Sequence, residues 1–339
     1  MKRIIISVTN DLLSDNRVHK VATSLINNGF DVILIGRRFS DSQNINRKYK
    51  IKRFKLIFNK NALFYAEYNL RLFIFLLFTK ADIFLSNDLD TLLANFIASK
   101  LRKKRLIYDS HELFTQVPEL IEKPKIQNFW LKIEKFILPK IKYAYTVCDS
   151  LANYYYKKYG LQMKVVRNVP KQIKCEEFRL KKDKKVVIYQ GSVNFARGLE
   201  DIISAMQYLE KVELWIVGNG DIIDELKKLV EKLKLENRVI FHGRVKFEDL
   251  CKYTKNADLG ISIEKNVGLN YYYSLPNKIF DYIHAEIPIL CSDFPEMIKI
   301  IKKYNVGTVL KTRIDREIAS QIEEIFSNKE QYQKWKKNL

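Results

Sequence analysis

The sequence has little of what marks secreted, zinc-stabilised or membrane-spanning proteins. Its four cysteines are scattered, without a CxxC pair or a cluster with the four histidines, so no structural metal is expected. Lys2 and Arg3 lead straight into the strand-like run 4–8, without a secretory signal. The most apolar stretch, residues 72–78, is much shorter than the roughly 20 residues of a membrane span. We therefore expect a cytoplasmic protein that uses no metal or other cofactor.

Acidic residues are also outnumbered by basic ones. The chain of 339 residues has 60 Lys and Arg against 39 Asp and Glu, a formal net charge of +21. Up to Asn168 there are 30 basic and 14 acidic residues, so this half carries +16 of that charge. The asymmetry predicts an anionic partner, which is a phospholipid surface, a phosphorylated substrate or nucleic acid. No zinc-finger, RRM or KH pattern is present, which disfavours nucleic acid. The alternative is a lysine-rich bias spread over solvated faces.

Strand-like and helix-like segments alternate along the whole chain, in two series separated at Asn168-Val169-Pro170. This alternation predicts an α/β fold with two doubly wound, Rossmann-like parallel sheets facing a cleft, with ligands at the carboxyl ends of the strands. The predicted domains are 1–168 and 169–312, followed by C-terminal helices in 313–339 that pack back toward the first domain. The predicted strands are 4–8, 32–35, 83–85, 105–108, 145–147 and 165–166, then 186–189, 214–217, 239–241, 259–263 and 287–290.

Two cations stand where helices of the second half are expected to begin. Lys278 follows Pro276 and Asn277 in a first helical turn, and Arg197 precedes a helix six residues after Gly191. A helix N-terminus repels cations but binds anions, so a cation there suits phosphate binding better than stability. Two such positions in one domain predict a shared pyrophosphate site, with both side chains exposed in the empty cleft. The alternative is a pair of solvated side chains on surface helices.

A partial dinucleotide-binding pattern follows one strand of the second half. Gly218-Asn219-Gly220 supplies two glycines of GxGxxG, but Ile223 replaces the third, and the pattern lies in the middle of the chain. A tight strand-to-helix turn explains these glycines as well as a nucleotide contact does. Classical dinucleotide binding is therefore disfavoured.

Polar side chains gather after three predicted elements of the first half. Asp109, His111 and Glu112 follow a strand, Asp88 follows another strand, and Asp15 precedes the first helix. At the carboxyl ends of strands these groups predict substrate contacts. The alternatives are helix N-caps and a histidine satisfied by neighbouring acids.

Taken in order, these segments resemble a glycosyltransferase of family 4 (group 1), a retaining enzyme of the two-domain GT-B fold. The resemblance spans nearly the whole chain, and each segment alone is weakly specific. The segments are Asp15-Asn16-Arg17-Val18-His19-Lys20, Asn87-Asp88-Leu89-Asp90-Thr91-Leu92, Tyr108-Asp109-Ser110-His111-Glu112-Leu113, Arg167-Asn168-Val169-Pro170, Arg197-Gly198-Leu199-Glu200 and residues 274–281.

The resemblance implies a role for each candidate residue. His111, Arg197 and Lys278 form the catalytic set, in which the two cations hold the donor diphosphate and His111 positions the sugar or stabilises developing charge. The sequence departs from the family at Ser192, where an arginine is usual, and at Tyr273, where the first of two paired glutamates is expected. We expect Glu264 to replace that glutamate in holding sugar hydroxyls, and Asp281 to bind the ribose. The implied donor-binding residues are Gly191, Gly218, Gly243, Glu264, Asn277 and Asp281, and the implied acceptor-binding residues are Asp15, Arg17 and Asp88.

The implied activity is transfer of a hexosyl group from a nucleoside-diphosphate sugar to a glycan or lipid-linked acceptor, in cell-surface polysaccharide synthesis. Two alternatives stay open: a sugar-nucleotide epimerase of the same fold and a catalytically silent nucleotide-sugar-binding subunit. Peripheral contact with an acidic membrane surface at the inner face of the plasma membrane is also predicted, because 63–78 is rich in aromatic and leucine residues around Arg71 and 100–105 is basic. The alternative for 70–78 is an ordinary core helix.

Overall fold

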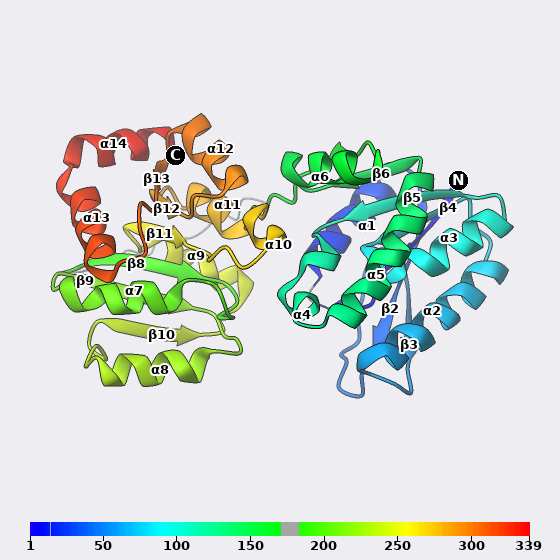
Figure 1. The fold of residues 1–339 in the computed structure, drawn as a ribbon, viewed down its shortest axis with the longest axis horizontal. Coiled ribbons are helices and arrows are strands. Elements are labelled where there is room, and N and C mark those ends of the chain that lie inside the picture. Colours follow the sequence, from blue (N-terminus) through cyan, green and yellow to red (C-terminus); the bar gives the residue numbers. More distant parts are fainter. Residues whose placement is uncertain (14, 171–182) are drawn as a thin grey trace. The chain divides into compact units, whose positions relative to one another are not determined.

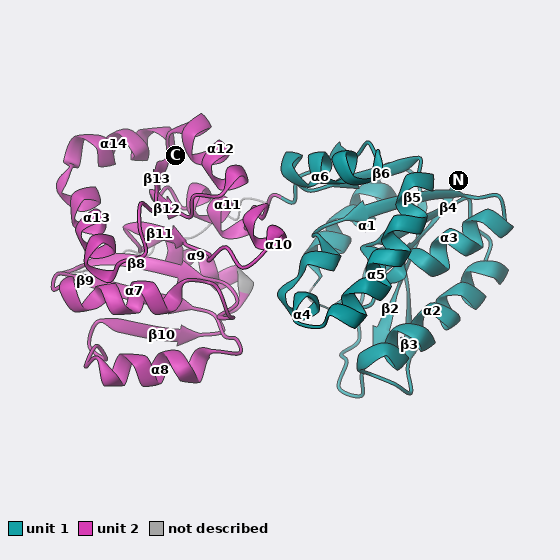
Figure 2. Cartoon of the chain, viewed as in Figure 1, with its two compact units in different colours: residues 1–168 teal, residues 169–339 magenta. Residues whose placement is uncertain are grey.

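The computed structural model describes residues 1–13, 15–170 and 183–339, which form two compact units. The first unit covers Met1–Asn168 and the second covers Val169–Leu339 (Figure 2). Their boundary lies at the seam that the sequence indicates. Each unit is a parallel sheet with helices, so the prediction of two doubly wound α/β domains is confirmed.

The first unit contains a seven-stranded parallel sheet in the order β3-β2-β1-β4-β5-β6-β7 (Figure 1). The strand order reverses between β1 and β4, which makes their carboxyl ends the expected ligand-binding position. The strands are β1 Arg3–Ser7, β2 Asp31–Arg38, β3 Lys50–Lys55, β4 Ile83–Asn87, β5 Arg105–Ser110, β6 Tyr143–Thr146 and β7 Lys164–Val165. The main helices are α1 Asn16–Asn27, α2 Asn61–Phe78, α3 Leu92–Leu101, α4 Pro118–Ile121, α5 Pro124–Ile137 and α6 Asp149–Tyr159.

Apolar side chains on both faces of this sheet explain its two helical layers. Ile4 and Ile6 of β1 pack with Val18 and Ala22 of α1 in one core cluster. Helices α2, α3 and α5 lie side by side, with α2 against α3 and α3 against α5 (Figure 1). Strands that are covered on both faces read as continuous apolar runs, which is why β1 was predictable.

The second unit contains a six-stranded parallel sheet in the order β10-β9-β8-β11-β12-β13. Here the order reverses between β8 and β11. The strands are β8 Lys185–Gln190, β9 Val212–Val217, β10 Val239–Gly243, β11 Leu259–Ser262, β12 Ile289–Cys291 and β13 Gly307–Val309. The helices are α7 Leu199–Ala205, α8 Ile223–Lys232, α9 Phe247–Lys255, α10 Leu269–Tyr272, α11 Asn277–His284, α12 Pro295–Tyr304, α13 Asp315–Ser327 and α14 Lys329–Asn338.

Helices α13 and α14 belong to the core of the second unit. Ile318, Ile322 and Trp335 are buried in one cluster with Leu199 and Ile203 of α7. The prediction treated 313–339 as a separate segment packing back toward the first domain. In the structure the apolar stripe of α13 is buried in the core of the second unit, and packing toward the first domain stays a prediction.

Two edge strands were absent from the prediction. Strand β3 has Lys50, Lys52, Arg53 and Lys55 around a single buried side chain, Phe54, so it lacks the apolar run used to recognise strands. Strand β13 has only three residues. Charged or very short strands are typical of sheet edges, where they discourage pairing with other chains.

Candidate functional site

Three predicted donor-binding glycines lie together at the carboxyl ends of adjacent strands. Gly191 follows β8, Gly218 follows β9 and Gly243 ends β10. The amide of Gly191 donates to the carbonyl of Val217, and the amide of Gly218 donates to the carbonyl of Gly243. The carboxyl ends of β8, β9 and β10 are therefore hydrogen-bonded to one another at the edge where an α/β sheet binds ligands.

Gly218 is required by this close approach. A Cβ atom built there would lie 1.8 Å from the carbonyl oxygen of Gly191, and the φ of Gly218 is +150°. Gly220 is equally constrained, since its Cβ would lie 2.3 Å from the carbonyl oxygen of Val193. The partial GxGxxG pattern thus has a packing explanation, as a turn pressed against the segment after β8.

Lys278 and Arg197 converge on one buried carboxylate. Lys278 Nζ lies 2.8 Å from Glu264 Oε1, and Arg197 Nη1 lies 3.8 Å from the same oxygen. Burial acts to raise the pKa of Glu264, but the two cations outweigh burial and lower it below its usual value. Each cation also faces an aromatic ring: Lys278 Nζ lies 4.1 Å from the centroid of Tyr189, and the Arg197 guanidinium lies 5.1 Å from that of Tyr271.

The burial of Lys278 corrects one expectation. Its side chain is 9% exposed and that of Arg197 is 26% exposed, whereas the prediction had both cations open to solvent. Glu264 is fully buried, and its second carboxylate oxygen accepts from Ser262 Oγ at 2.9 Å. Glu264 therefore holds the two predicted phosphate-binding cations in place, a role that the expectation of sugar-hydroxyl binding did not include.

Helix α11 brings Asp281 to the same edge. The helix begins at Asn277, so Lys278 stands in its first turn and Asp281 one turn later. Asp281 Oδ2 accepts from Gln190 Nε2 at 2.9 Å, and Gln190 Oε1 accepts from Thr254 Oγ1 at 2.6 Å. Gln190 was missed by the sequence analysis, although a polar residue at the end of a buried strand and directly before Gly191 could have indicated it.

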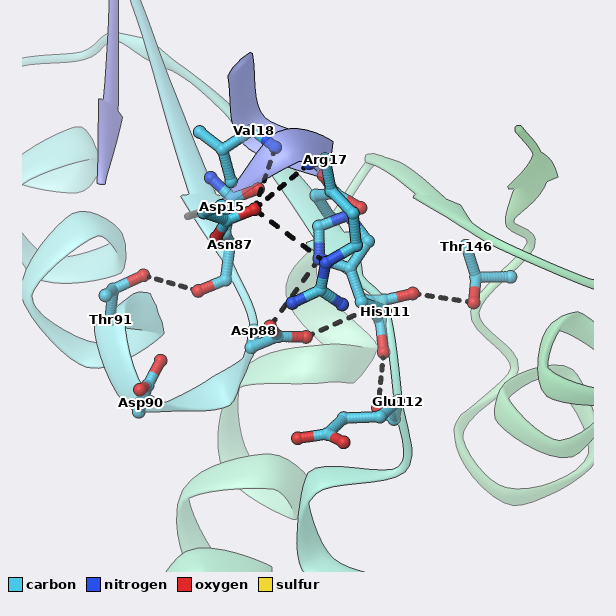
Figure 3. Close-up of polar contacts among 12 residues, drawn as sticks. Asp15, Arg17, Val18, Asn87, Asp88, Asp90, Thr91, His111, Glu112 and Thr146 are labelled. Carbon is cyan, nitrogen blue, oxygen red and sulfur yellow. Dashed lines mark hydrogen bonds and ion pairs between the residues drawn. The ribbon is translucent and has the colours of Figure 1, made fainter. Parts of the chain in front are cut away.

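In the first unit, Asp15 is the N-cap of α1 (Figure 3). Its carboxylate accepts from the amides of Arg17 and Val18, each at 3.1 Å. Asn10, which follows β1, donates to the other carboxylate oxygen at 2.6 Å. Arg17 Nε lies 3.9 Å from Asp15, and its positive charge contributes to lowering the pKa of Asp88. The predicted acceptor residues Asp15, Arg17 and Asp88 therefore lie close together, while Asp15 also has the capping role that was its alternative.

His111 lies between two carboxylates, as Figure 3 shows for Asp88. Its Nε2 is 3.0 Å from Asp109 Oδ2 and its Nδ1 is 3.6 Å from Asp88 Oδ2, and its amide donates to Asp88 Oδ1 at 2.9 Å. Burial acts to lower the pKa of His111, but the two acids outweigh it and raise the pKa to about 10. His111 is therefore an imidazolium at neutral pH. Asp109 was noted in the sequence but not assigned to the site, and its burial raises its own pKa.

Asp90 is a second acid that the sequence analysis left unassigned. It follows β4 by three residues, and its Oδ2 lies 2.5 Å from Thr9 Oγ1, just after β1. Burial, together with the charge of Asp88, raises the pKa of Asp90 to about 7. This acid and the His111 cluster occupy the carboxyl ends of β4 and β5, near the reversal of strand order.

In the ranges that the structure describes, no three His, Cys, Asp or Glu side chains converge as a metal site would require. Across the same described ranges, every helix falls short of the length and apolar content needed to cross a membrane.

The two doubly wound sheets, each with polar groups at the carboxyl ends of its strands, define a GT-B protein. Solved structures agree with this fold. A sucrose-phosphate synthase from Thermosynechococcus elongatus superposes over 100% of this chain and 93% of its own, with a TM-score of 0.81 at 15% identity. Anabaena Alr3699/HepE in complex with UDP and glucose superposes over 100% and 93%, with a TM-score of 0.73 at 14% identity.

The chain belongs to the glycosyl transferases group 1 family, whose profile matches residues 170–339. Residues 15–177 match the profile of Glycosyltransferase Family 4. Among curated proteins, a chitobiosyldiphosphodolichol beta-mannosyltransferase of Candida albicans is 25% identical over 258 residues, covering 67% of this chain and 56% of that protein. The chain thus spans little more than half the length of this relative.

Proposed function

We propose that this glycosyltransferase moves a hexosyl group from a nucleoside-diphosphate sugar to a glycan or lipid-linked acceptor in cell-surface polysaccharide synthesis. The observation that carries the proposal is the pairing of Lys278 and Arg197 on Glu264, beside Gly191 and Asp281. Two cations held at a glycine-lined strand edge suit a diphosphate, and a carboxylate one helical turn away suits ribose hydroxyls. The Anabaena protein was solved in complex with UDP and glucose, and the Candida relative is a chitobiosyldiphosphodolichol beta-mannosyltransferase.

The proposed chemistry needs charge stabilisation more than acid-base catalysis. As the bond from the sugar to the diphosphate breaks, negative charge grows on the leaving phosphate. Arg197 and Lys278 neutralise that charge, together with backbone amides at the start of α11, so no metal is assigned a role. We propose retention of anomeric configuration, in which the leaving phosphate accepts the proton of the acceptor hydroxyl on the same face.

We assign acceptor binding to Asp15, Arg17 and Asp88 of the first unit. His111, an imidazolium held by two carboxylates, has no lone pair with which to accept a proton. Its proposed role is therefore to position the sugar and to stabilise charge, and not to act as the general base. We place the enzyme in the cytoplasm, at the inner face of an acidic membrane that carries the acceptor.

Nucleotide-sugar consumption with and without acceptor tests this function. Incubation of the purified chain with a panel of nucleotide sugars should release nucleoside diphosphate faster when a glycan or lipid-linked acceptor is added. Conversion of the donor to another sugar nucleotide without acceptor would instead identify an epimerase, and binding without any conversion would identify a silent subunit. NMR of the new glycosidic bond tests retention, which inversion of the anomeric configuration would contradict.

Asp281→Ala should weaken binding of the nucleoside diphosphate by about 1.5 to 3 kcal/mol, the value of a hydrogen bond to a charged group. Asp281→Glu, which keeps the carboxylate, is the matched control and should retain most of the affinity. Isothermal titration calorimetry with the nucleotide identified above measures both variants. Equal affinity in Asp281→Ala and the wild type would remove Asp281 from the ribose site.

Arg197→Ala should lower kcat by roughly a hundredfold, as the loss of a charge-stabilising donor does in other enzymes. Because its side chain is partly exposed, folding should change little. Arg316→Ala, at an exposed cation in α13 that faces Tyr208, is the control for loss of a surface charge beside a ring. Wild-type turnover in Arg197→Ala would contradict the diphosphate role.

A further inference from the structure

Helix α2 of the first unit presents apolar side chains to solvent as well as to the core. Tyr68, Leu72 and Leu76 are fully buried on one side. On the opposite side Leu70 is 59% exposed and Phe78 is 84% exposed, and Leu63 and Ile74 continue the same stripe. Residues 70–78 therefore contain a core face, as one alternative predicted, together with an exposed apolar face that packing within this unit does not explain.

The neighbouring helices extend this apolar surface. Leu101 of α3 is 65% exposed, and Phe129 and Phe136 of α5 are 56% and 59% exposed. Helix α2 contacts α3 and α3 contacts α5, so the three helices form one layer of the unit (Figure 1). We call the solvent-facing surface of α2, α3 and α5 the three-helix face.

Cations outnumber acidic groups on and around the three-helix face. The exposed cations on or just beyond these helices include Arg71, Lys100, Lys103, Lys125, Lys132, Lys135 and Lys140. Lys140 Nζ lies 3.2 Å from the ring centroid of Phe136. The acidic residues of the three helices are Glu67, which pairs with Arg71, and Glu134, which is buried and accepts from Tyr159 at 2.7 Å. Just beyond them, Glu122 is exposed two residues before α5.

We infer that the three-helix face docks on the anionic leaflet of a phospholipid bilayer. Aromatic and aliphatic side chains enter the interface between headgroups and acyl chains, while the surrounding lysines contact lipid phosphates. A second copy of the chain fits this surface poorly, because pairing it with itself would bring lysines against lysines. The inference rests on the proposed function only for the identity of the lipid-linked acceptor, and it adds the surface by which the enzyme reaches that acceptor.

Vesicle sedimentation tests the inference with the full chain. Vesicles of phosphatidylcholine alone and of phosphatidylcholine with phosphatidylglycerol are compared at low and high salt. The wild type should bind only the acidic vesicles, and high salt should release it from them. Lys132→Gln with Lys135→Gln should weaken binding roughly twenty- to thirtyfold, because each interfacial cation contributes about 1 kcal/mol. Phe78→Ser should also weaken binding, through the loss of an inserted ring.

Exposed residues of α12 in the second unit supply matched controls. Tyr304→Ser and Lys302→Gln with Lys303→Gln change the same chemistry elsewhere, and vesicle binding should stay at the wild-type level. Absence of binding, equal binding to neutral vesicles, or equal loss in the controls would overturn the inference. Self-association abolished by Phe78→Ser in analytical ultracentrifugation would identify a dimer surface instead. Calorimetry of nucleotide binding separates the two proposals, since the three-helix variants should bind nucleotide as the wild type does.

Discussion

Lys278→Ala is expected to lower both the stability of the fold and the rate of transfer. Removing this ammonium leaves the fully buried Glu264 with Arg197 at 3.8 Å and Ser262 as its remaining polar side-chain contacts in the described structure. Breaking a buried ion pair on one side costs about 3 to 5 kcal/mol, since the other charge stays buried. The same change removes a cation from the proposed diphosphate site, so kcat should fall roughly a hundredfold. Urea unfolding and steady-state kinetics measure the two effects.

A double variant separates the structural effect from the catalytic one. Glu264→Gln with Lys278→Met removes both charges while keeping similar side-chain volumes, so most of the lost stability should return. Turnover should stay low, because the diphosphate has still lost Lys278. If transfer recovers together with stability, Lys278 is a structural residue and the diphosphate assignment is wrong. Unchanged stability in Lys278→Ala would contradict the buried pair itself.

His111→Gln is expected to change how stability depends on pH. The pKa of His111 is about 10 in the folded chain and near 6.5 when unfolded. Because the folded pKa is the higher one, the stabilisation is complete below about pH 6.5 and is lost as pH rises toward 10. The wild type should therefore lose stability relative to His111→Gln across this window. Urea unfolding at pH values between 6 and 10, for both proteins, measures the difference.

Turnover provides a second test of the same histidine. If His111 were a general base, kcat would rise with pH through a pKa near 6.5. Because His111 is protonated, we expect no such rise. His111→Gln should lower kcat, since glutamine retains hydrogen bonding but not positive charge. NMR titration of the His111 ring gives its pKa directly. A midpoint near 6.5 would contradict the imidazolium held by Asp88 and Asp109.

Much of the fold was predictable because buried parallel strands leave a clear pattern. The runs 186–189 and 214–217 are apolar without interruption, and the run 4–8 is broken only by the buried Ser7, since each strand is covered on both faces. The edge strands β3 and β13 were not predicted, because an edge strand is half solvated and can be charged or short. Helices α13 and α14 were recognised as helices, but sequence periodicity does not say which core an apolar stripe will join.

For the candidate site, the two cations were predicted from the sequence, but their pairing with a buried carboxylate was not. The position of Lys278 at a helix start follows from its neighbours in the chain, and so does that of Asp281. Glu264 comes from a different strand, and its pairing with Lys278 depends on the order of strands in the sheet. The same is true of Gln190, whose contact with Asp281 joins residues 91 positions apart. The pattern of neighbouring residues does not reveal contacts between distant parts of the chain. The burial of Lys278 was therefore not predicted.

The most direct test of the account is the thermal stability of the wild-type chain with a panel of nucleoside diphosphates and their sugars. A ligand at a hundred times its Kd stabilises the folded state by about 2.7 kcal/mol, which should raise Tm by several degrees. We predict such a rise for nucleotides of one base, with a larger rise for the diphosphate than for the monophosphate. If no nucleotide raises Tm, or if mono- and diphosphate act equally, the diphosphate site at Arg197 and Lys278 is contradicted.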